Sequence, residues 1–125
     1  PPGHHLPVHA VCVHLGLQES HRQHQLRRVC DLVNSFPANE AVVLAGDFND
    51  WRNRAHDILH REAGLQEVFV QAFGRAVRTF PAAMPLLALD RIYVRNATVH
   101  SPLALPKKPW DKLSDHAPLA AEILL

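Results

Sequence analysis

The chain has 125 residues, 47% of them apolar and 20% charged, and its formal net charge is +1. This length and composition are typical of one globular domain, and a charge so close to zero neither requires nor excludes nucleic acid as a partner. No apolar run reaches the length of a transmembrane helix, and we expect a cytoplasmic or membrane-peripheral protein. Two cysteines form no disulfide scaffold, so we expect Cys12 and Cys30 to be buried thiols.

The first half of the chain alternates strand and helix patterns. Two stretches are apolar on both alternating faces, which predicts buried strands, and two others repeat apolar residues at helical spacing. Ser20 and Gln23 fit a capping box at the start of the first helix, and Gly64 fits the end of the second. The four expected elements are a strand at 8–17, a helix at 19–36, a strand at 41–46 and a helix at 53–64.

The second half is richer in proline and in short strands. The stretch 67–73 fits either a strand or a helical turn, and 89–95 alternates like a strand. We expect loops at 74–88 and 101–113, a short partner strand at Val99, and a last strand within 116–125. A succession of strand, helix, strand, helix and further strands predicts a single α/β domain.

Polar side chains follow or end the apolar strands at four places. These are His14, the pair Asp47 and Asn49, Asp90, and the pair Asp115 and His116. Loops at strand ends are where α/β folds bind ligands. A carboxylate between apolar residues needs a compensating partner. We therefore expect Asp90 to accept a hydrogen bond from a histidine, which would fix the tautomer of that imidazole.

Each of these groups also has a purely structural interpretation. The residues 47–49 after a glycine fit a simple Asx turn, and His14 fits a core histidine with satisfied hydrogen bonds. Asp90 has Arg91 and Arg95 nearby in sequence as alternative partners. The order and spacing of the whole set, rather than any one member, favour a functional site.

Other polar residues are expected to be solvated. His56 and His60 lie four apart on a predicted helix, a metal-ligand spacing, but no glutamate directly follows His56. The positive charges of the first helix are likewise typical of a solvated face. This second group consists of His21, Arg22, His24, Arg27 and Arg28.

The segments HLGL, GDFND, LDRIYV and SDHAPL, in this order, resemble the later half of the endonuclease/exonuclease/phosphatase family, from about Val8 to Leu125. The resemblance implies half of a four-layer α/β/β/α sandwich, with one mixed β-sheet and helices on one face. It also implies that residues 1–125 are the C-terminal half of a catalytic domain. The asparagine and the metal-binding glutamate of the family's first half have no counterpart before His14.

The resemblance assigns catalytic roles by position. Asp47 matches the aspartate that orients or activates the attacking water, and Asn49 matches the amide that steadies the phosphate. Asp90 matches the carboxylate that hydrogen-bonds the catalytic histidine, which is His116. His14 matches a histidine that contacts the scissile phosphate in nuclease members.

The resemblance also implies a metal and a substrate cleft. Asp115, with Asp47 and Asn49, is expected to bind the metal, and hard oxygen ligands suit Mg²⁺ or Mn²⁺ rather than zinc. Three side chains beside the expected cleft are predicted to bind substrate: Trp51, Arg78 and Trp110.

The expected function is metal-dependent hydrolysis of a phosphate ester by the intact protein, with a nucleic acid, a nucleotide or a phospholipid headgroup as substrate. Two alternatives remain at this stage: a non-catalytic binding or assembly module, and a phospholipid or sugar-phosphate phosphatase rather than a nuclease. Little activity is expected of residues 1–125 alone. Their exposed sheet face is expected to pair with a second copy or with the missing half.

Overall fold

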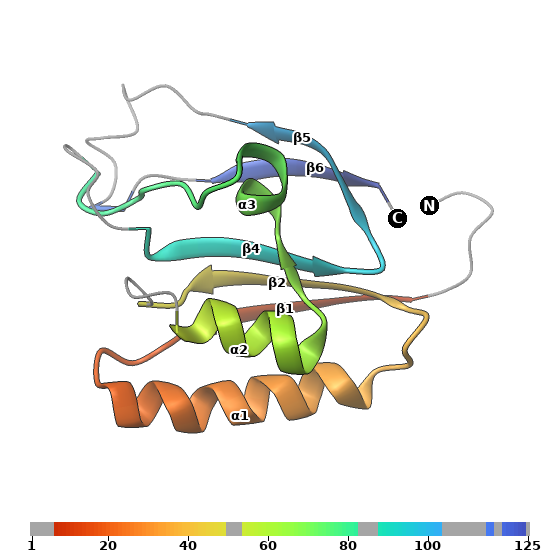
Figure 1. Ribbon diagram of the computed structural model, residues 1–125, viewed down its shortest axis with the longest axis horizontal. Helices are drawn as coiled ribbons and strands as arrows, with labels where there is room; N and C mark the ends of the chain where they lie inside the picture. Colours follow the sequence, from red (N-terminus) through yellow and green to blue (C-terminus); the bar gives the residue numbers. More distant parts are fainter. Residues whose placement is uncertain (1–6, 50–53, 83–87, 104–114, 117–118, 125) are drawn as a thin grey trace.

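The computed structural model describes residues 7–49, 54–82, 88–103, 115–116 and 119–124 (Figure 1). The strands and helices in these ranges follow the expected order, with short strands predominating in the second half. They are β1 (Val8–His14), α1 (Glu19–Ser35), β2 (Ala41–Asp47), α2 (Arg54–Ala63), β3 (Gln66–Glu67), α3 (Val68–Phe73), β4 (Asp90–Arg95), β5 (Thr98–Leu103) and β6 (Ala120–Leu124).

The four strands β1, β2, β4 and β3 form a mixed sheet in that spatial order. β1 and β2 are parallel and are connected through α1, whereas β4 runs antiparallel to both β2 and β3. A separate antiparallel pair joins β5 to β6. Figure 1 shows α1 and α2 on one side of β1 and β2, and α3 with the β5–β6 pair on the other side of the main sheet.

One face of the main sheet packs against α1 and α2. Val42 and Leu44 of β2 and Tyr93 of β4 point to this face and are fully buried. They meet the apolar side of α1, where Leu26 and Val33 are also buried. Burying one such side chain contributes about 1.5–3 kcal/mol, so this layer is the main core of the chain.

The opposite face carries a smaller second core. Val43 of β2 and Val94 of β4 belong to it, because their side chains alternate with those of the first face. Phe69 of α3 and Ile123 of β6 cover them. The predicted single sheet with helices on one face is therefore supplemented by α3 and a two-stranded sheet on the other face.

β1 is covered on one face only. It forms one edge of the sheet, and Val8, Ala10 and Cys12 are exposed on the face away from α1. The prediction that this strand is buried on both sides is wrong for the described residues, and so is the prediction that Cys12 is buried. Cys30, in contrast, is buried in the main core.

Element ends differ from the sequence pattern where local hydrogen bonds decide them. The expected capping box is wrong: α1 begins at Glu19, and the Gln23 amide donates to Glu19 Oε1 at 2.9 Å, not to a Ser20 backbone group. Gly64 adopts the expected left-handed conformation after α2, with φ of 65°. β5 extends through Leu103 into the stretch expected to be a loop.

The ambiguous stretch 67–73 begins as a strand and continues as a helix. Glu67 pairs with Tyr93 in the sheet and then caps α3, its Oε2 accepting from the Val70 N–H at 2.7 Å. Burial raises the pKa of this carboxyl group, only partly offset by the backbone donors at the start of α3. Glu67 Oε1 is buried without a hydrogen-bond partner among the described residues.

We expect Glu67→Ala to lower the free energy of unfolding of the intact protein by about 1 kcal/mol, because α3 loses its cap. Glu67→Gln keeps an acceptor and removes the buried charge. The pKa of Glu67 is raised in the folded state above its ordinary value of 4.5. The free energy of unfolding of the wild type therefore falls as the pH rises from 4.5 through the raised pKa, and Glu67→Gln lacks this loss. Urea unfolding from pH 4 to pH 8 measures both effects. Equal pH dependence of the wild type and Glu67→Gln would contradict the assignment.

Candidate active site

Three polar residues stand in one row across the main sheet. The strand register pairs His14 of β1 with Asp47 of β2, and Asp47 with Asp90 of β4. Directly paired residues project to the same face of a sheet, here the face opposite α1 and α2. The sheet therefore gathers an imidazole and two carboxylates from three strands at one end.

His116 joins this row from the segment before β6. Its Nδ1 donates to Asp90 Oδ2 at 2.5 Å, and its Nε2 lies 3.8 Å from Asp47 Oδ2. The same Asp47 oxygen lies 3.7 Å from Nε2 of His14. Asp47 is thus placed between two imidazoles, and Asp90 orients one of them.

Asp90 is itself held by a buried hydroxyl. Thr79 Oγ1 donates to Asp90 Oδ2 at 2.7 Å and accepts from the Asp90 backbone N–H at 3.1 Å. Phe80 follows Thr79, and its ring centroid lies 5.0 Å from that of His116. The sequence interpretation missed both residues. Their only signal was a Thr-Phe-Pro stretch within the loop that the resemblance placed beside the cleft.

The surroundings of His116 favour its protonated form. Burial of the imidazole lowers its pKa, but the hydrogen bond to Asp90 and the charges of Asp90, Asp47 and Asp115 raise it by more. The pKa of His116 therefore lies above its ordinary 6.5. A protonated imidazole beside two carboxylates can donate a proton or stabilise an anionic group near neutral pH.

The end of β2 is fixed by a turn. The Asn49 N–H donates to Asp47 Oδ1 at 2.9 Å, which is the expected Asx turn, and Asn49 Nδ2 donates to the Leu15 carbonyl at 2.5 Å. At Gly46 a Cβ would lie 1.9 Å from the Val13 carbonyl oxygen, so no side chain fits there. The structural interpretation of GDFN holds, and the turn also sets the orientation of the Asp47 carboxylate.

Two residues expected to be solvated are held by the fold instead. Arg22 is buried, donates to the Gly16 carbonyl at 3.1 Å and pairs with Glu19, which fixes the loop that follows His14. The His56 Nδ1 lies 3.2 Å from the hydroxyl oxygen of a buried tyrosine on β4. The expectation of solvation is therefore wrong for Arg22 and for His56.

Asp47, Asp90 and His116 form a group that could hold a metal ion. Each offers one ligand atom, and these atoms all lie within 4.8 Å of one another. The two carboxylates suit Mg²⁺ or Mn²⁺, whereas the imidazole is also a common ligand of zinc and other transition metals. Asp115, expected as a ligand, is exposed and does not belong to the group, while its backbone carbonyl accepts from the Ala82 N–H at 2.8 Å.

The expected substrate contacts are only partly described. Arg78 is exposed and directly precedes Thr79, so it lies next to the residue that holds Asp90. Trp51 and Trp110 lie outside the described residues.

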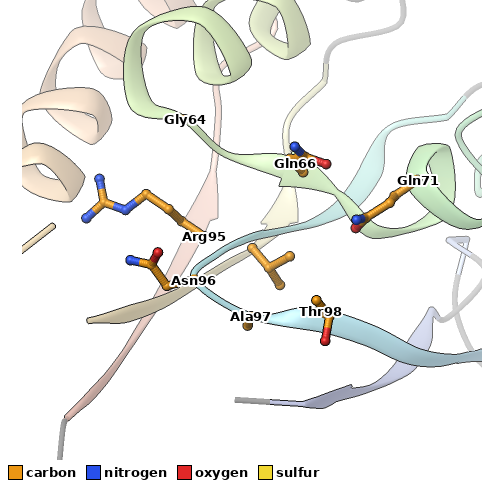
Figure 2. A pocket seen from close by; sticks show the side chains of 8 residues that line it. Gly64, Gln66, Gln71, Arg95, Asn96, Ala97 and Thr98 are labelled. Carbon is orange, nitrogen blue, oxygen red and sulfur yellow. The ribbon is translucent and has the colours of Figure 1, made fainter. Parts of the chain in front are cut away.

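A cavity of about 540 Å³ lies at the far end of β4 from these residues. Figure 2 shows Arg95 extending away from the other lining side chains, and its Nη2 donates to the Val33 carbonyl at 3.2 Å near the end of α1. Asn96 Nδ2 likewise donates to the Ala38 carbonyl at 2.5 Å. The main polar groups of this cavity therefore fasten the β4–β5 turn to the neighbouring elements.

The sequence pattern of the endonuclease/exonuclease/phosphatase family matches residues 7–116. The uncharacterized protein YbhP of Escherichia coli K12 is 57% identical over 118 residues, and so is YbhP of Shigella flexneri. The match covers 94% of this chain and 47% of each relative. The chain therefore spans about half the length of the curated relatives it matches.

Solved structures share the fold at low sequence identity. Humanized Danio rerio TDP2 matches with a TM-score of 0.78 and 21% identity over 94% of this chain and 55% of that chain. A conserved protein of unknown function from Enterococcus faecalis matches with 0.77 and 23% over 98% and 52%. D. rerio TDP2 complexed with a single-strand DNA product matches with 0.68 and 22% over 86% and 52%. The main sheet with its helices thus corresponds to half of the TDP2 fold.

Within the described ranges, no helix combines the length and the apolar character that a membrane crossing needs.

We expect Asp90→Asn to lower the pKa of His116, because the variant removes the carboxylate charge and weakens the acceptor of the Nδ1 proton. Asp57→Asn, an exposed change on α2, is the matched control and should leave this pKa unchanged. NMR titration of the His116 imidazole in the intact protein measures the shift. An unchanged pKa in Asp90→Asn would show that the hydrogen bond does not set the charge of His116.

Proposed function

Because the chain belongs to the endonuclease/exonuclease/phosphatase family, we propose that the intact protein is a metal-dependent phosphoesterase whose site includes these residues. The single observation that carries the proposal is that Asp47, Asp90 and His116, from three separate segments, bring their ligand atoms within 4.8 Å of one another. Such a row of charged groups is costly to assemble in a half-buried place unless a ligand or partner compensates it.

The geometry supports a division of roles. Asp90 holds the Nδ1 proton of His116, which turns Nε2 toward Asp47 and fixes the tautomer. Asp47, fixed by its Asx turn, would orient the attacking water. His14 is 80% exposed in its side chain and lies on the other side of Asp47, where it can reach a leaving oxygen.

The raised pKa of His116 agrees with these roles. A protonated imidazole supplies positive charge to the phosphate as negative charge develops on it. The amide of Asn49, next to Asp47, would steady the same phosphate. A bound Mg²⁺ or Mn²⁺ would supply Lewis-acid stabilisation of that charge, held by the carboxylates of Asp47 and Asp90 with Asp115 beside them, while the protonated His116 keeps its role as a donor.

Residues 1–125 are proposed to be the C-terminal half of the catalytic domain. The open face of β1 supports this, because Val8, Ala10 and Cys12 lie exposed on the face that carries the candidate site. The match to only 47% of YbhP supports it as well. The other half would cover this face and contribute the glutamate that the family's metal site uses.

The proposed substrate is a phosphate ester: a nucleic acid, a nucleotide or a phospholipid headgroup. One similar structure, D. rerio TDP2, is complexed with a single-strand DNA product, which supports a phosphate-ester substrate for a site on the same fold. We also propose a cytoplasmic or membrane-peripheral location for the intact protein.

We expect the intact protein with Mg²⁺ to hydrolyse bis-p-nitrophenyl phosphate, and His116→Ala to lower kcat by roughly 10²–10⁴-fold, because the variant removes an acid–base group. Chelation with EDTA should abolish turnover, and Mg²⁺ or Mn²⁺ should restore it. His24→Ala, an exposed change on α1, is the control and should retain full turnover. Absent turnover in the wild type, or equal turnover in His116→Ala, would contradict the proposal and favour a non-catalytic binding module.

We also expect residues 1–125 alone to self-associate through the open face of β1, provided that circular dichroism shows them folded. Ala10→Lys should reduce this association, because it places a charge in the centre of the apolar face. Leu32→Lys, at an exposed apolar position on α1, is the matched control. Light scattering at high concentration measures the oligomeric state, and a strictly monomeric wild-type chain would contradict the proposal.

A further inference from the structure

A pocket of about 640 Å³ lies along the segment that immediately precedes Thr79. The segment between α3 and Thr79 lines it, with the residues Phe73, Arg75, Ala76, Val77 and Arg78. Arg78 is adjacent in sequence to Thr79, whose hydroxyl holds Asp90, so the two Cα atoms are about 3.8 Å apart. The pocket therefore ends within one residue of the groups that orient His116.

The pocket presents an exposed aromatic ring. Phe73 is 52% exposed, and it is the one aromatic residue among the exposed large apolar side chains of the described ranges. Its ring lies 6.2 Å from the ring of Phe69, which is buried, so one side of Phe73 is anchored on the core. Gly74 follows with φ of 80°, and a Cβ there would meet no atom within 4 Å. The 52% exposure of Phe73 leaves part of its ring accessible to a ligand.

Two positive charges line the same pocket as this ring. Arg75 and Arg78 are both exposed, and neither guanidinium has a hydrogen bond or ion pair with any other part of the chain that the structure describes. Among the lining residues that the structure describes there is no acidic side chain. Arg54, in contrast, lies 3.6 Å from Glu19 and is partly neutralised by it. The pocket is therefore an anion-attracting surface around an aromatic platform.

A pocket that holds an aromatic ring and two arginines is suited to a nucleobase with its neighbouring phosphates. Bases stack on aromatic side chains whatever their sequence, and arginines bind the backbone phosphates on either side. A phospholipid fits less well, because its acyl chains need an extended apolar surface, and the apolar groups among the described lining residues are just Phe73, Ala76 and Val77.

We propose that this pocket binds the nucleotide next to the scissile phosphate in a single-stranded nucleic acid, with the base on Phe73 and its flanking phosphates at Arg75 and Arg78. The inference rests on the proposed function for the position of the scissile phosphate, and it names the substrate class of that site. The pocket is therefore expected to bind a nucleic acid strand through its base. A small chromogenic diester has no base and gains no affinity from the pocket.

The test measures binding rather than turnover. A fluorescein-labelled oligothymidylate is titrated with the intact protein in EDTA, and anisotropy reports the dissociation constant. We expect Phe73→Ala to weaken binding by roughly 5- to 150-fold, the range for loss of one stacked base. Phe73→Trp should retain binding, whereas Phe73→Leu should not, since it keeps the apolar character and removes the aromatic face.

The arginines are tested through salt. The double variant Arg75→Gln/Arg78→Gln should reduce the slope of log K against log salt by about 1.4, because each lost contact to a single-strand phosphate contributes about 0.7. Arg27→Gln/Arg28→Gln, which removes two exposed charges from α1, is the matched control and should leave the slope near that of the wild type.

The outcomes separate this proposal from the proposed function. Failure to hydrolyse bis-p-nitrophenyl phosphate would overturn the hydrolase but not the pocket, because the binding assay contains EDTA. Wild-type affinity in Phe73→Ala, or a slope change equal to that of the α1 control, would overturn the pocket. Binding of phosphatidylglycerol vesicles that depends on Phe73, without binding of the oligonucleotide, would overturn it in favour of a membrane surface.

Discussion

The hydrogen bond between Asp90 and His116 is the interaction on which the candidate site depends. It joins the first residue of β4 to a segment near the C-terminus, and so it closes the row that the sheet register begins. Thr79, buried and bonded to the same carboxylate, keeps Asp90 in place. Without this pair, His14 and Asp47 would stand alone at two strand ends. With it, the charged groups form one cluster.

The arrangement of the sheet explains why this cluster lies at an open edge. The same alternation that sends Val42, Leu44 and Tyr93 toward α1 and α2 sends Asp47 and Asp90 to the opposite face. That face is covered by α3 and β6 over β4 but not over β1. The candidate site is therefore half-buried on one side and open on the other, where a substrate has access.

Much of the fold could be predicted from the sequence, because periodicity and termination signals are local. The strands β1, β2 and β4 and the helices α1 and α2 were recognised within a few residues. The exposed face of β1 was not predicted, because apolar residues on both sides of a strand are typical of burial on both sides, and Val8, Ala10 and Cys12 are exposed here. The switch from β3 to α3 depends on Glu67, a capping residue that the apolar pattern does not reveal.

The site was predictable from motif order, but its supporting contacts were not. Thr79 and Phe80 act through tertiary contacts that no spacing in the sequence specifies, and Arg22 binds the nearby Gly16 carbonyl in a loop whose conformation the sequence pattern does not predict. The central claim, that distant segments form one metal-binding group, is tested most directly by NMR of the intact protein with substoichiometric Mn²⁺. The account predicts selective paramagnetic broadening of the His116 imidazole, abolished by Asp47→Asn, while the signal of His60 on α2 persists. Equal broadening of both histidines, or none at His116, would contradict it.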